Sequence, residues 1–425
     1  MSERPMRRAA FWLSILVLSG LVACAPPAVV PEPAVELDGA NLDELLDRYT
    51  NTRRDPGSDM RLLIDGPDSR AAFTELIESA RHHLHIETLY FEDDRDRPEN
   101  LSLAIAEMLS NQAARGTAVR LLVDPLAQDF AGLPELEEIM ADGGVEVRRF
   151  GVPGPAILDE MFYGGHKKIL LADGDRAIIG GMNYGYVYFT TEEWRDTNVL
   201  LTGPVVATIQ REFLHDWGRL GSPAPEAEDH FPTLEPTGTL AIRAMDQRPS
   251  EGHFDINTAV LIAIRSATET IDIEAGYFNP IDWMADALFD AVARGVRVRV
   301  LVNSYRAVDW KEVYFVAANW FDTLVDHGVE LYLWERDQTL HSKAMTVDDT
   351  FAFVGSYNFN YRSIVWDTEN VVIFTDPPAI EQVRRMVEDD FTAEGAIRVD
   401  RAWLQAVPMS ERALWRAWWT VGWLF

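Results

Sequence analysis

The chain has 425 residues, 47% of them hydrophobic, which is enough for one large or two ordinary globular domains. Its formal net charge of -30 repels phosphate backbones and argues against non-specific binding of nucleic acid. A single cysteine excludes an internal disulfide and a thiolate metal cluster.

Residues 1–23 are predicted to be a signal peptide. The basic stretch MSERPMRR precedes the apolar run AAFWLSILVLSGLVAC, which is short for a membrane span. The run ends in LVAC, which resembles a bacterial lipobox, in which the cysteine, here Cys24, is lipidated and becomes the new amino terminus. A plain signal peptide with an accidental cysteine is the alternative. Residues 24–58 then begin with Pro- and Ala-rich sequence and are predicted to be a tether.

A lipidated Cys24 would place the protein in a bacterial cell envelope, on a membrane surface outside the cytoplasm. Ala25 and Pro26 give no inner-membrane retention signal of the aspartate kind. The expected location in a two-membrane bacterium is therefore the periplasmic face of the outer membrane.

Most of the remaining chain is one unit that occurs twice. ARGTAVRLLVD (114–124) is echoed by ARGVRVRVLVN (293–303), and HLHIETLYFEDD (83–94) by TIDIEAGYFNPI (270–281). Each copy alternates helical segments with β-rich apolar runs, which predicts an α/β fold in which helices flank a mixed β-sheet. We place the copies at 59–220 and 241–400, joined by a Pro-rich acidic linker at 221–240.

A histidine and a lysine two positions apart recur at the same place in both copies. Four polar residues of the first copy have counterparts 175 positions later: His166 and His341, Lys168 and Lys343, Asp173 and Asp348, Asn183 and Asn358. Positions i and i+2 of a strand face the same side, so each histidine projects together with its lysine. A hairpin turn at the aspartate then returns the asparagine to the histidine. The two aspartates are expected to brace the backbone at these turns.

Two such groups face to face suit the cleavage of a phosphodiester. Lysine ammonium groups and asparagine amides can hold the non-bridging oxygens. One histidine can attack phosphorus while the other protonates the leaving oxygen. Because the lysines provide the positive charge, no metal and no other cofactor is expected.

The sequence resembles the phospholipase D superfamily, whose signature HxK(x)4D(x)6GSxN appears in both copies. The second copy matches in full, with Gly355 and Ser356, whereas the first has Gly181 at the serine position. The segments IETLYFEDD, GGMNYG, WRDTNV and FLHDW resemble bacterial cardiolipin synthases in particular, although Asn198 stands where their usual pattern has a histidine. The resemblance covers about residues 60–400.

This resemblance implies two phospholipase D-like repeats packed as a pseudo-twofold pair around one site. The implied catalytic set is His166, Lys168, Asp173, His341, Lys343 and Asp348, with Asn183 and Asn358 binding phosphate. The superfamily also orients each histidine with an acidic residue downstream of its motif. Asp196 and Glu369 occupy those positions, 30 and 28 residues after their histidines. By analogy with other members, His166 is expected to be the nucleophile.

The expected activity is phosphatidyl transfer through a phosphatidyl-histidine, with phosphatidylglycerol as the lipid and cardiolipin as the product. Phospholipase D hydrolysis to phosphatidic acid is the first alternative. A nuclease and a non-enzymatic lipoprotein are less favoured alternatives. The expected partners are phospholipid and the membrane, without nucleic acid, and the expected form is a monomer.

Three further groups of residues each have two possible interpretations from the sequence. His82, His83 and His85 enter a predicted strand and form either a partly solvated edge or a metal site. Tyr90 and Tyr277, at equivalent strand ends, either line the pocket or pack in the core. The Trp-rich helix predicted at 401–425 either binds a bilayer interface and adds a membrane contact to Cys24, or closes the fold.

Overall fold

The structure is a computed structural model that describes residues 30–130, 132–133, 135–151, 163–191, 193–219 and 230–425. The predicted signal peptide, Cys24 and the first part of the predicted linker lie outside these residues. Among the residues described, no helix is both long enough and apolar enough to cross a membrane.

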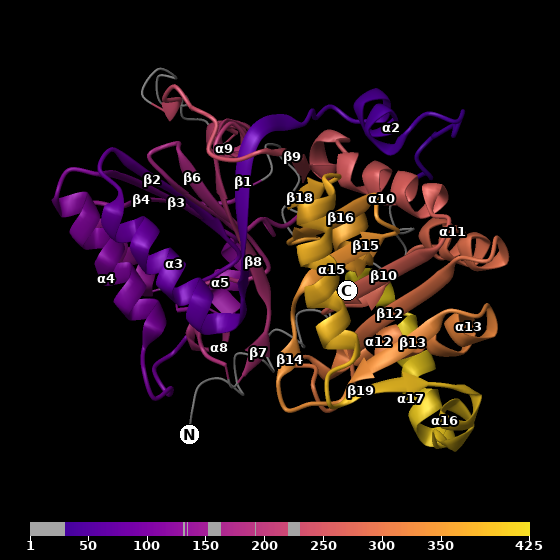
Figure 1. Ribbon diagram of the computed structural model, residues 1–425. Helices are drawn as coiled ribbons and strands as arrows, with labels where there is room; N and C mark the ends of the chain where they lie inside the picture. Colours follow the sequence, from indigo (N-terminus) through magenta and orange to yellow (C-terminus); the bar gives the residue numbers. More distant parts are fainter. Residues whose placement is uncertain (1–29, 131, 134, 152–162, 192, 220–229) are drawn as a thin grey trace.

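One mixed sheet of fifteen strands runs through the whole molecule, and its two halves repeat the same strand order outward from the centre. The first half is β1 (Asp55–Ile64), β8 (Thr197–Thr202), β6 (Arg176–Gly180), β5 (Ile169–Ala172), β2 (His83–Thr88), β3 (Ala118–Val123) and β4 (Glu146–Arg149). The second half is β9 (Leu240–Gln247), β18 (Glu369–Phe374), β16 (Phe351–Gly355), β15 (Lys343–Val347), β10 (Thr270–Ala275), β12 (Arg297–Asn303), β13 (Glu330–Trp334) and β19 (Ala396–Val399). Strands β1 and β9 pair antiparallel in the middle, so the predicted pseudo-twofold pair of α/β repeats is confirmed (Figure 1).

Helices cover both faces of each half-sheet, which explains why the central strands are apolar on both sides. Three helices bury the outer face of the first half: α3 (Asp65–Ser79), α4 (Leu101–Ala114) and α6 (Glu135–Asp142). The second half has α10 (Asp255–Ser266), α11 (Asp282–Ala293), α12 (Lys311–Ala318) and α13 (Phe321–Asp326) in the same role. The other face carries α9 (Val205–Gly218) and α15 (Pro377–Phe391), which share one core with strands of both halves. Short elements complete the fold: α5 (Pro125–Phe130), β7 (Trp194–Arg195), α8 (Tyr186–Phe189), β11 (Phe278–Asn279), β14 (Thr339–Leu340), β17 (Phe359–Asn360) and α14 (Tyr361–Val365).

The folded body begins inside the stretch predicted as a tether. Helix α2 (Leu42–Tyr49) starts at Asn41, whose side chain forms a capping box with Glu44. Leu45 and Leu46 are buried in the core of the second half, where α2 packs on α10. The Pro- and Ala-rich composition ends before this helix, and the apolar pair that follows is what attaches it to the body.

Two groups of buried ion pairs, one around Lys167 and one around Arg195, connect the two halves. Lys167, which lies between the motif histidine and lysine, donates to Asp216 of α9 and to Asp246 of β9, each at 2.6 Å. Arg195 of β7 donates to Asp390 of α15 at 2.6 Å. Removing the carboxylates from either group would leave the Lys167 or the Arg195 charge buried without a partner, which costs about 3–5 kcal/mol of folding free energy. The histidine segments are therefore anchored to both halves by charge as well as by packing.

The C-terminal residues close the fold of the second half. Helices α16 (Arg401–Ala406) and α17 (Met409–Trp419) bury Leu404 and Trp415 in its core. Asn279 donates to the Gly422 carbonyl at 2.8 Å and fixes the end of the chain. Leu414 and Trp419 of α17 nevertheless remain about half exposed. The Trp-rich segment is thus a closing helix with some apolar side chains on its outer side.

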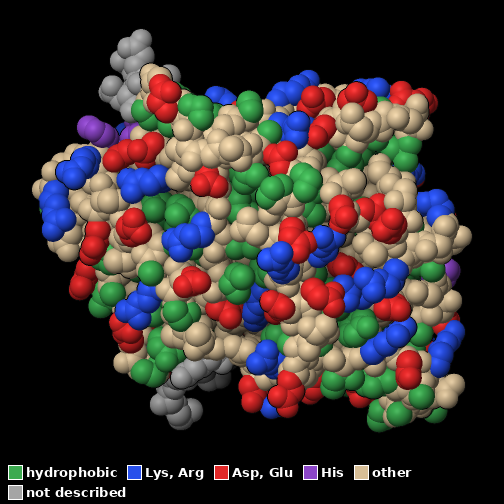
Figure 2. Space-filling model, viewed as in Figure 1, with side chains coloured by type: hydrophobic (Ala, Val, Ile, Leu, Met, Phe, Trp, Pro, Cys, Tyr) green, Lys and Arg blue, Asp and Glu red, His purple; other side chains and the backbone are tan. Residues whose placement is uncertain are grey.

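The charged side chains are distributed over the surface. Figure 2 shows acidic and basic side chains interspersed across one face of both halves. The large negative net charge is therefore not gathered into a single acidic patch on that face.

The histidines of β2 differ from the expected partly solvated edge. Strand β2 lies between β5 and β3, inside the sheet, so His83 and His85 are 2% and 0% exposed. His82, just ahead of the strand, is exposed. Both edges of β2 are paired, and Phe213 of α9 and His230 cover the face that carries the two rings, which single-sequence alternation does not reveal.

Candidate active site

The two histidine segments meet because each pairs with the backbone of the other half. Strand β14, which leads into His341, runs parallel to β7, and the His341 amide donates to the Arg195 carbonyl at 2.7 Å. The His166 amide donates to the Thr368 carbonyl at 3.1 Å. The same contact occurs in both directions, so the pseudo-twofold relation passes through the site.

Each histidine is held by a carboxylate from the opposite half. Asp196 follows Arg195, and its Oδ2 lies 2.6 Å from Nδ1 of His341. Glu369 follows Thr368, and its two oxygens lie 2.9 and 3.0 Å from Nδ1 of His166. In this arrangement Nδ1–H donates to the carboxylate, and Nε2 keeps the lone pair that can react.

This pairing differs from the expectation that each carboxylate orients the histidine of its own motif. The spacing of 30 and 28 residues places Asp196 and Glu369 at the starts of β8 and β18, which lie next to the central strands of the sheet. The carboxylates at these strand starts contact the histidines of the opposite half. The sequence spacing does not show whether a carboxylate binds the histidine of its own motif or that of the other motif.

The two carboxylates have different surroundings. Glu369 accepts from the hydroxyls of Ser356 and Ser363, and burial raises its pKa to about 7. Burial would raise the pKa of Asp196 as well, but His341 and Lys343 outweigh it and hold that pKa below its usual value. Asp196 is therefore firmly ionised, whereas Glu369 titrates near neutral pH.

The glycine at the serine position of the first motif is explained by the carboxylate beside it. A Cβ on Gly181 would lie 2.1 Å from Oδ1 of Asp196. In the second motif Ser356 fits because Glu369 accepts a hydrogen bond from its hydroxyl. The two halves thus hold their histidines with different residue pairs. Gly181 is combined with Asp196, and Ser356 with Glu369.

We expect Gly181→Ser to lower kcat by about 10²-fold, because the new side chain must push Asp196 out of line with His341. Steady-state kinetics with a phosphodiester substrate measures the effect. Gly218→Ser is the matched control, since a Cβ there meets nothing within 4 Å. Unchanged turnover in Gly181→Ser would contradict the stated role of Asp196.

The lysines lie against the same histidines. Lys168 Nζ donates to the His166 carbonyl at 2.6 Å, and Lys343 Nζ donates to the His341 carbonyl. Burial lowers the pKa of Lys168 to about 7 and that of Lys343 to about 8, although Glu369 and Asp196 oppose the shift. Two lysines whose charge is made costly by burial are well placed to receive an anion.

The two asparagines are positioned differently. Asn183 accepts from the Thr88 hydroxyl and the Leu89 amide, both at 3.1 Å, and donates to the Tyr188 hydroxyl at 2.8 Å. Asn358 is buried, and its Oδ1 has no hydrogen-bond partner among the residues that the structure describes. Asn183 is therefore tied to the end of β2, while the Asn358 carbonyl oxygen is not engaged.

The motif aspartates lie outside the site. Asp173 (φ 53°) accepts from the amides of Arg81, His82 and His83. Asp348 (φ 46°) accepts in the same way from the amides of residues 268–270. They brace the hairpin turns and do not join the catalytic groups, although the resemblance includes them in the catalytic set.

Aromatic side chains surround His341. The rings of Trp194, Tyr188 and Tyr277 lie 4.5, 5.7 and 6.0 Å from its ring, centroid to centroid. The hydroxyls of Tyr90 and Tyr188 are 2.9 Å apart. Tyr90 and Tyr277 thus belong to the lining. Trp194 and Tyr188 were not identified from the sequence, although Trp194 lies two residues before Asp196.

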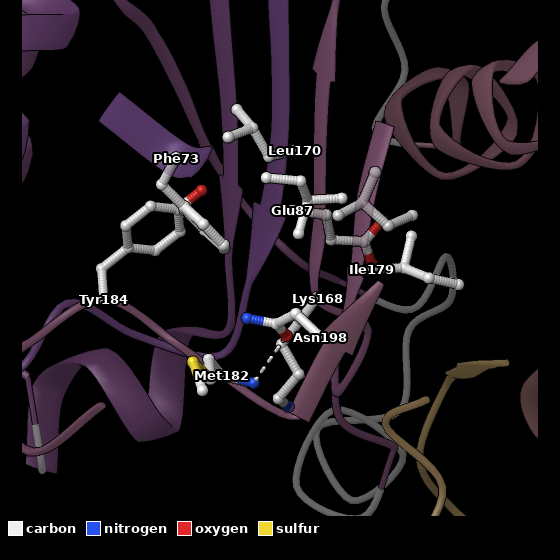
Figure 3. A pocket seen from close by; sticks show the side chains of 10 residues that line it. Phe73, Glu87, Lys168, Leu170, Ile179, Met182, Tyr184 and Asn198 are labelled. Atoms are coloured by element: carbon white, nitrogen blue, oxygen red, sulfur yellow. Dashed lines mark hydrogen bonds between the residues drawn. The ribbon is translucent and has the colours of Figure 1, made fainter. Parts of the chain in front are cut away.

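A small pocket beside Lys168 belongs to the interior of the first half. Figure 3 shows Phe73 and Tyr184 on one side of it and Glu87, Lys168 and Asn198 on the other, with the Met182 amide donating to Asn198 at 3.3 Å. Its lining leaves no room for a water molecule. The pocket is therefore part of the packed interior next to the site, where the Asn198 side chain accepts a hydrogen bond from the Met182 backbone amide.

The family model described as "Cardiolipin synthase, PLD-like domain" matches residues 73–217 and 260–391. The chain is 29% identical over 351 residues to a cardiolipin synthase 2 of Bacillus anthracis, covering 81% of this chain and 66% of that protein. It is 31% identical over 338 residues to a cardiolipin synthase A of Pseudomonas putida (strain GB-1), covering 78% and 68%. The chain spans about two thirds of the length of these curated relatives.

A crystal structure of phosphatidylserine synthase from Haemophilus influenzae Rd KW20 has the same fold, with a TM-score of 0.69 at 15% identity over 91% of this chain and all of that one. The family match covers both halves, each of which contributes one histidine, one lysine and one carboxylate to the site. The chain therefore belongs to the phospholipase D-like family of the cardiolipin synthases.

Proposed function

We propose that the chain is a phosphatidyltransferase that moves the phosphatidyl group of one phosphatidylglycerol to the hydroxyl of another, giving cardiolipin and glycerol. The observation that carries this proposal is the pair of histidines, one buried and one largely buried, each bonded through Nδ1 to a carboxylate of the opposite half and each next to a lysine. The relatives named cardiolipin synthase support the choice of lipid. Both motifs lie in one chain, so the proposed working form is a monomer.

In the first step His166 attacks and His341 acts as the acid. Burial lowers the pKa of His166 well below its usual value, so its Nε2 carries a free lone pair at neutral pH. That lone pair forms a bond to phosphorus as the bond from phosphorus to the glycerol oxygen breaks. His341 gives its Nε2 proton to the leaving oxygen, and Lys168 and Lys343 hold the charge of the phosphoryl oxygens.

His341 is neutral at pH 7, because burial and the neighbouring Lys343 lower its pKa to about 3. A bound phosphodiester anion neutralises the lysines, and His341 can then take up the proton it needs as an acid. The ionised Asp196 stabilises this imidazolium better than Glu369, which titrates near pH 7, would stabilise one on His166. This difference supports His341 as the acid and His166 as the nucleophile.

In the second step the acceptor hydroxyl gives its proton to the neutral His341 and attacks phosphorus. The bond from phosphorus to Nε2 of His166 breaks, and the enzyme returns to its starting state. Transfer is favoured over hydrolysis because the site is buried and lined by aromatic rings, which suits a lipid hydroxyl better than water.

Incubation of the mature protein with phosphatidylglycerol, followed by separation of the products, tests this proposal. Cardiolipin with an equal amount of glycerol is the expected result. Phosphatidic acid as the main product would replace the proposal with hydrolysis, and cleavage of an oligonucleotide but of no lipid would replace it with a nuclease.

The pH dependence of kcat/KM is expected to be bell-shaped, with a narrow maximum between about pH 7 and 8. Below the pKa of Glu369, about 7, a protonated carboxyl no longer accepts from His166. Above the pKa values of Lys168 and Lys343, about 7 and 8, the site loses its positive charge. These groups interact, so the two limbs report the cluster as a whole. Lys168 loses its charge first, so Lys168→Arg should move the alkaline limb to higher pH, and a flat profile in both proteins would contradict the assignment.

We also propose that lipidated Cys24 holds the enzyme on a membrane outside the cytoplasm, at the periplasmic face of the outer membrane in a two-membrane bacterium. The lipobox-like LVAC and the Pro-rich stretch after it support this placement. Attachment confines the search for lipid to a surface and offsets repulsion between the acidic protein and an anionic bilayer.

Cys24→Ser is expected to block lipidation and leave the signal peptide uncleaved. A chain that starts at Val30, exported by an unrelated cleavable signal, keeps α2 and should be released from membranes by a high-salt wash while remaining active on detergent-dispersed lipid. Cell fractionation measures this release. If this chain stays with the membranes, the exposed apolar residues of α17 are an anchor in their own right.

A further inference from the structure

Three buried histidine rings gather at the end of β2 that lies away from the active site. His83 and His85 project from the same face of β2, and His230 belongs to the segment before β9. Their ring centroids lie 4.6, 4.8 and 5.0 Å apart, and all three rings are at most 5% exposed. One ring nitrogen from each lies within 4.8 Å of the other two.

We propose that His83, His85 and His230 form a binding site for a divalent late transition metal, with Zn²⁺ as the occupant. Neutral imidazoles are its usual nitrogen ligands, and three protein ligands leave a fourth position for water. Ligand nitrogens around tetrahedral Zn²⁺ lie about 3.4 Å apart, since each bond is about 2.1 Å long. Rotations of the rings that move each nitrogen by about one ångström therefore bring the three nitrogens to this separation.

The surroundings of His85 indicate how the site would be completed. Arg120 Nη1 lies 3.0 Å from its Nε2 and Gln210 Nε2 lies 2.8 Å from its Nδ1, so two donors face a ring with one lone pair. Gln210 Oε1 has no hydrogen-bond partner among the described residues. Turning the Gln210 amide over lets Oε1 accept from Nδ1–H, which is the outer contact that metal-binding histidines usually make.

The remaining lone pair, on Nε2 of His85, then faces the space that Arg120 occupies. The Arg120 side chain has a second partner in Glu146, at 3.7 Å, towards which it can turn. His83 Nε2 is buried without a hydrogen-bond partner in the described part of the chain, so one ligand atom is already free. A metal ion would give Nε2 of His83 a partner and would take the lone pair of His85 in place of Arg120.

The position of the cluster defines what the metal would do. The backbone carbonyl of His230 lies against the Asp173–Gly174 turn, because a Cβ on Gly174 would meet it at 2.5 Å. The ion would link the segment between the halves, through His230, to His83 and His85 of β2. Thr88, which contacts Asn183 of the active site, lies further along β2, five residues from His83 and three from His85, or about 16 and 10 Å away. The metal would therefore stabilise the fold and take no part in the chemistry.

The test compares full-length mature protein with His230→Ala and with His82→Ala, an exposed histidine of the same region as matched control. After removal of metal with EDTA and re-addition of Zn²⁺, elemental analysis should give about one Zn²⁺ per chain in the wild type and His82→Ala. His230→Ala should retain less than about a tenth of that, and Gln210→Met should weaken the affinity by about 10–100-fold. Circular dichroism verifies that each variant is folded.

Two more measurements separate this site from the active site. Co²⁺ bound in place of Zn²⁺ should give the intense visible absorption of a tetrahedral site, lost in His230→Ala. Metal removal should lower the melting temperature of the wild type while leaving phosphatidyl transfer unchanged at a temperature where both forms are folded. Failure of wild-type protein to bind Zn²⁺, or equal binding in His230→Ala, would overturn the proposal.

Discussion

His166→Ala and His341→Ala are each expected to lower turnover of phosphatidylglycerol by at least about 10⁴-fold. Both histidines serve one phosphorus atom, so neither motif can work alone. The losses must occur in folded protein, because each ring makes its strong contact with one carboxylate and leaves the backbone pairing of the segment in place. Product formation from radiolabelled lipid measures the effect, and far-ultraviolet circular dichroism verifies the fold.

His82→Ala is the control for this pair, since that exposed histidine lies outside the site. It should keep wild-type turnover. If either His166→Ala or His341→Ala also kept near-wild-type turnover, the two motifs would be independent sites, and the single-pocket arrangement would be wrong.

Asp196→Asn and Glu369→Gln are expected to lower turnover by about 10²–10⁴-fold, because an amide no longer holds the imidazole in the reactive tautomer. The two losses should differ with the leaving group. A phosphatidyl ester of p-nitrophenol departs without a proton, so it does not need the acid His341. The burst of p-nitrophenol from the first step should therefore survive in Asp196→Asn, as in His341→Ala, and disappear in Glu369→Gln, as in His166→Ala.

This comparison tests the pairing across the halves independently of which histidine attacks. Whatever the order of events, Asp196→Asn must share the pattern of His341→Ala, and Glu369→Gln that of His166→Ala. If Asp196→Asn instead behaved like His166→Ala, each carboxylate would serve its own motif, and the arrangement described for the site would be contradicted.

The sequence by itself determined the repeat, the α/β class and which histidines and lysines form the candidate site. These are local properties: strand alternation places a histidine and a lysine on one face, an Asp-Gly turn ends a strand, and a copied motif copies its geometry. The bracing role of Asp173 and Asp348 was predictable for the same reason, because a carboxylate at a turn meets the amides of the adjoining strand. The glycine at position 181 was visible as a departure from the motif but had no explanation.

Only the tertiary structure decided which groups from distant parts of the chain meet. The central β1–β9 pair sets the halves side by side, and the starts of β8 and β18 then cross into the opposite half. Asp196 therefore holds His341, and its carboxylate fills the space that a side chain at position 181 would need. Likewise, the interior position of β2 and the path of the linker bring His230 next to His83 and His85. His230 lies 145 residues after His85 in the sequence. Such contacts follow from the order of strands in a sheet, which hydrophobic periodicity along a single chain does not specify.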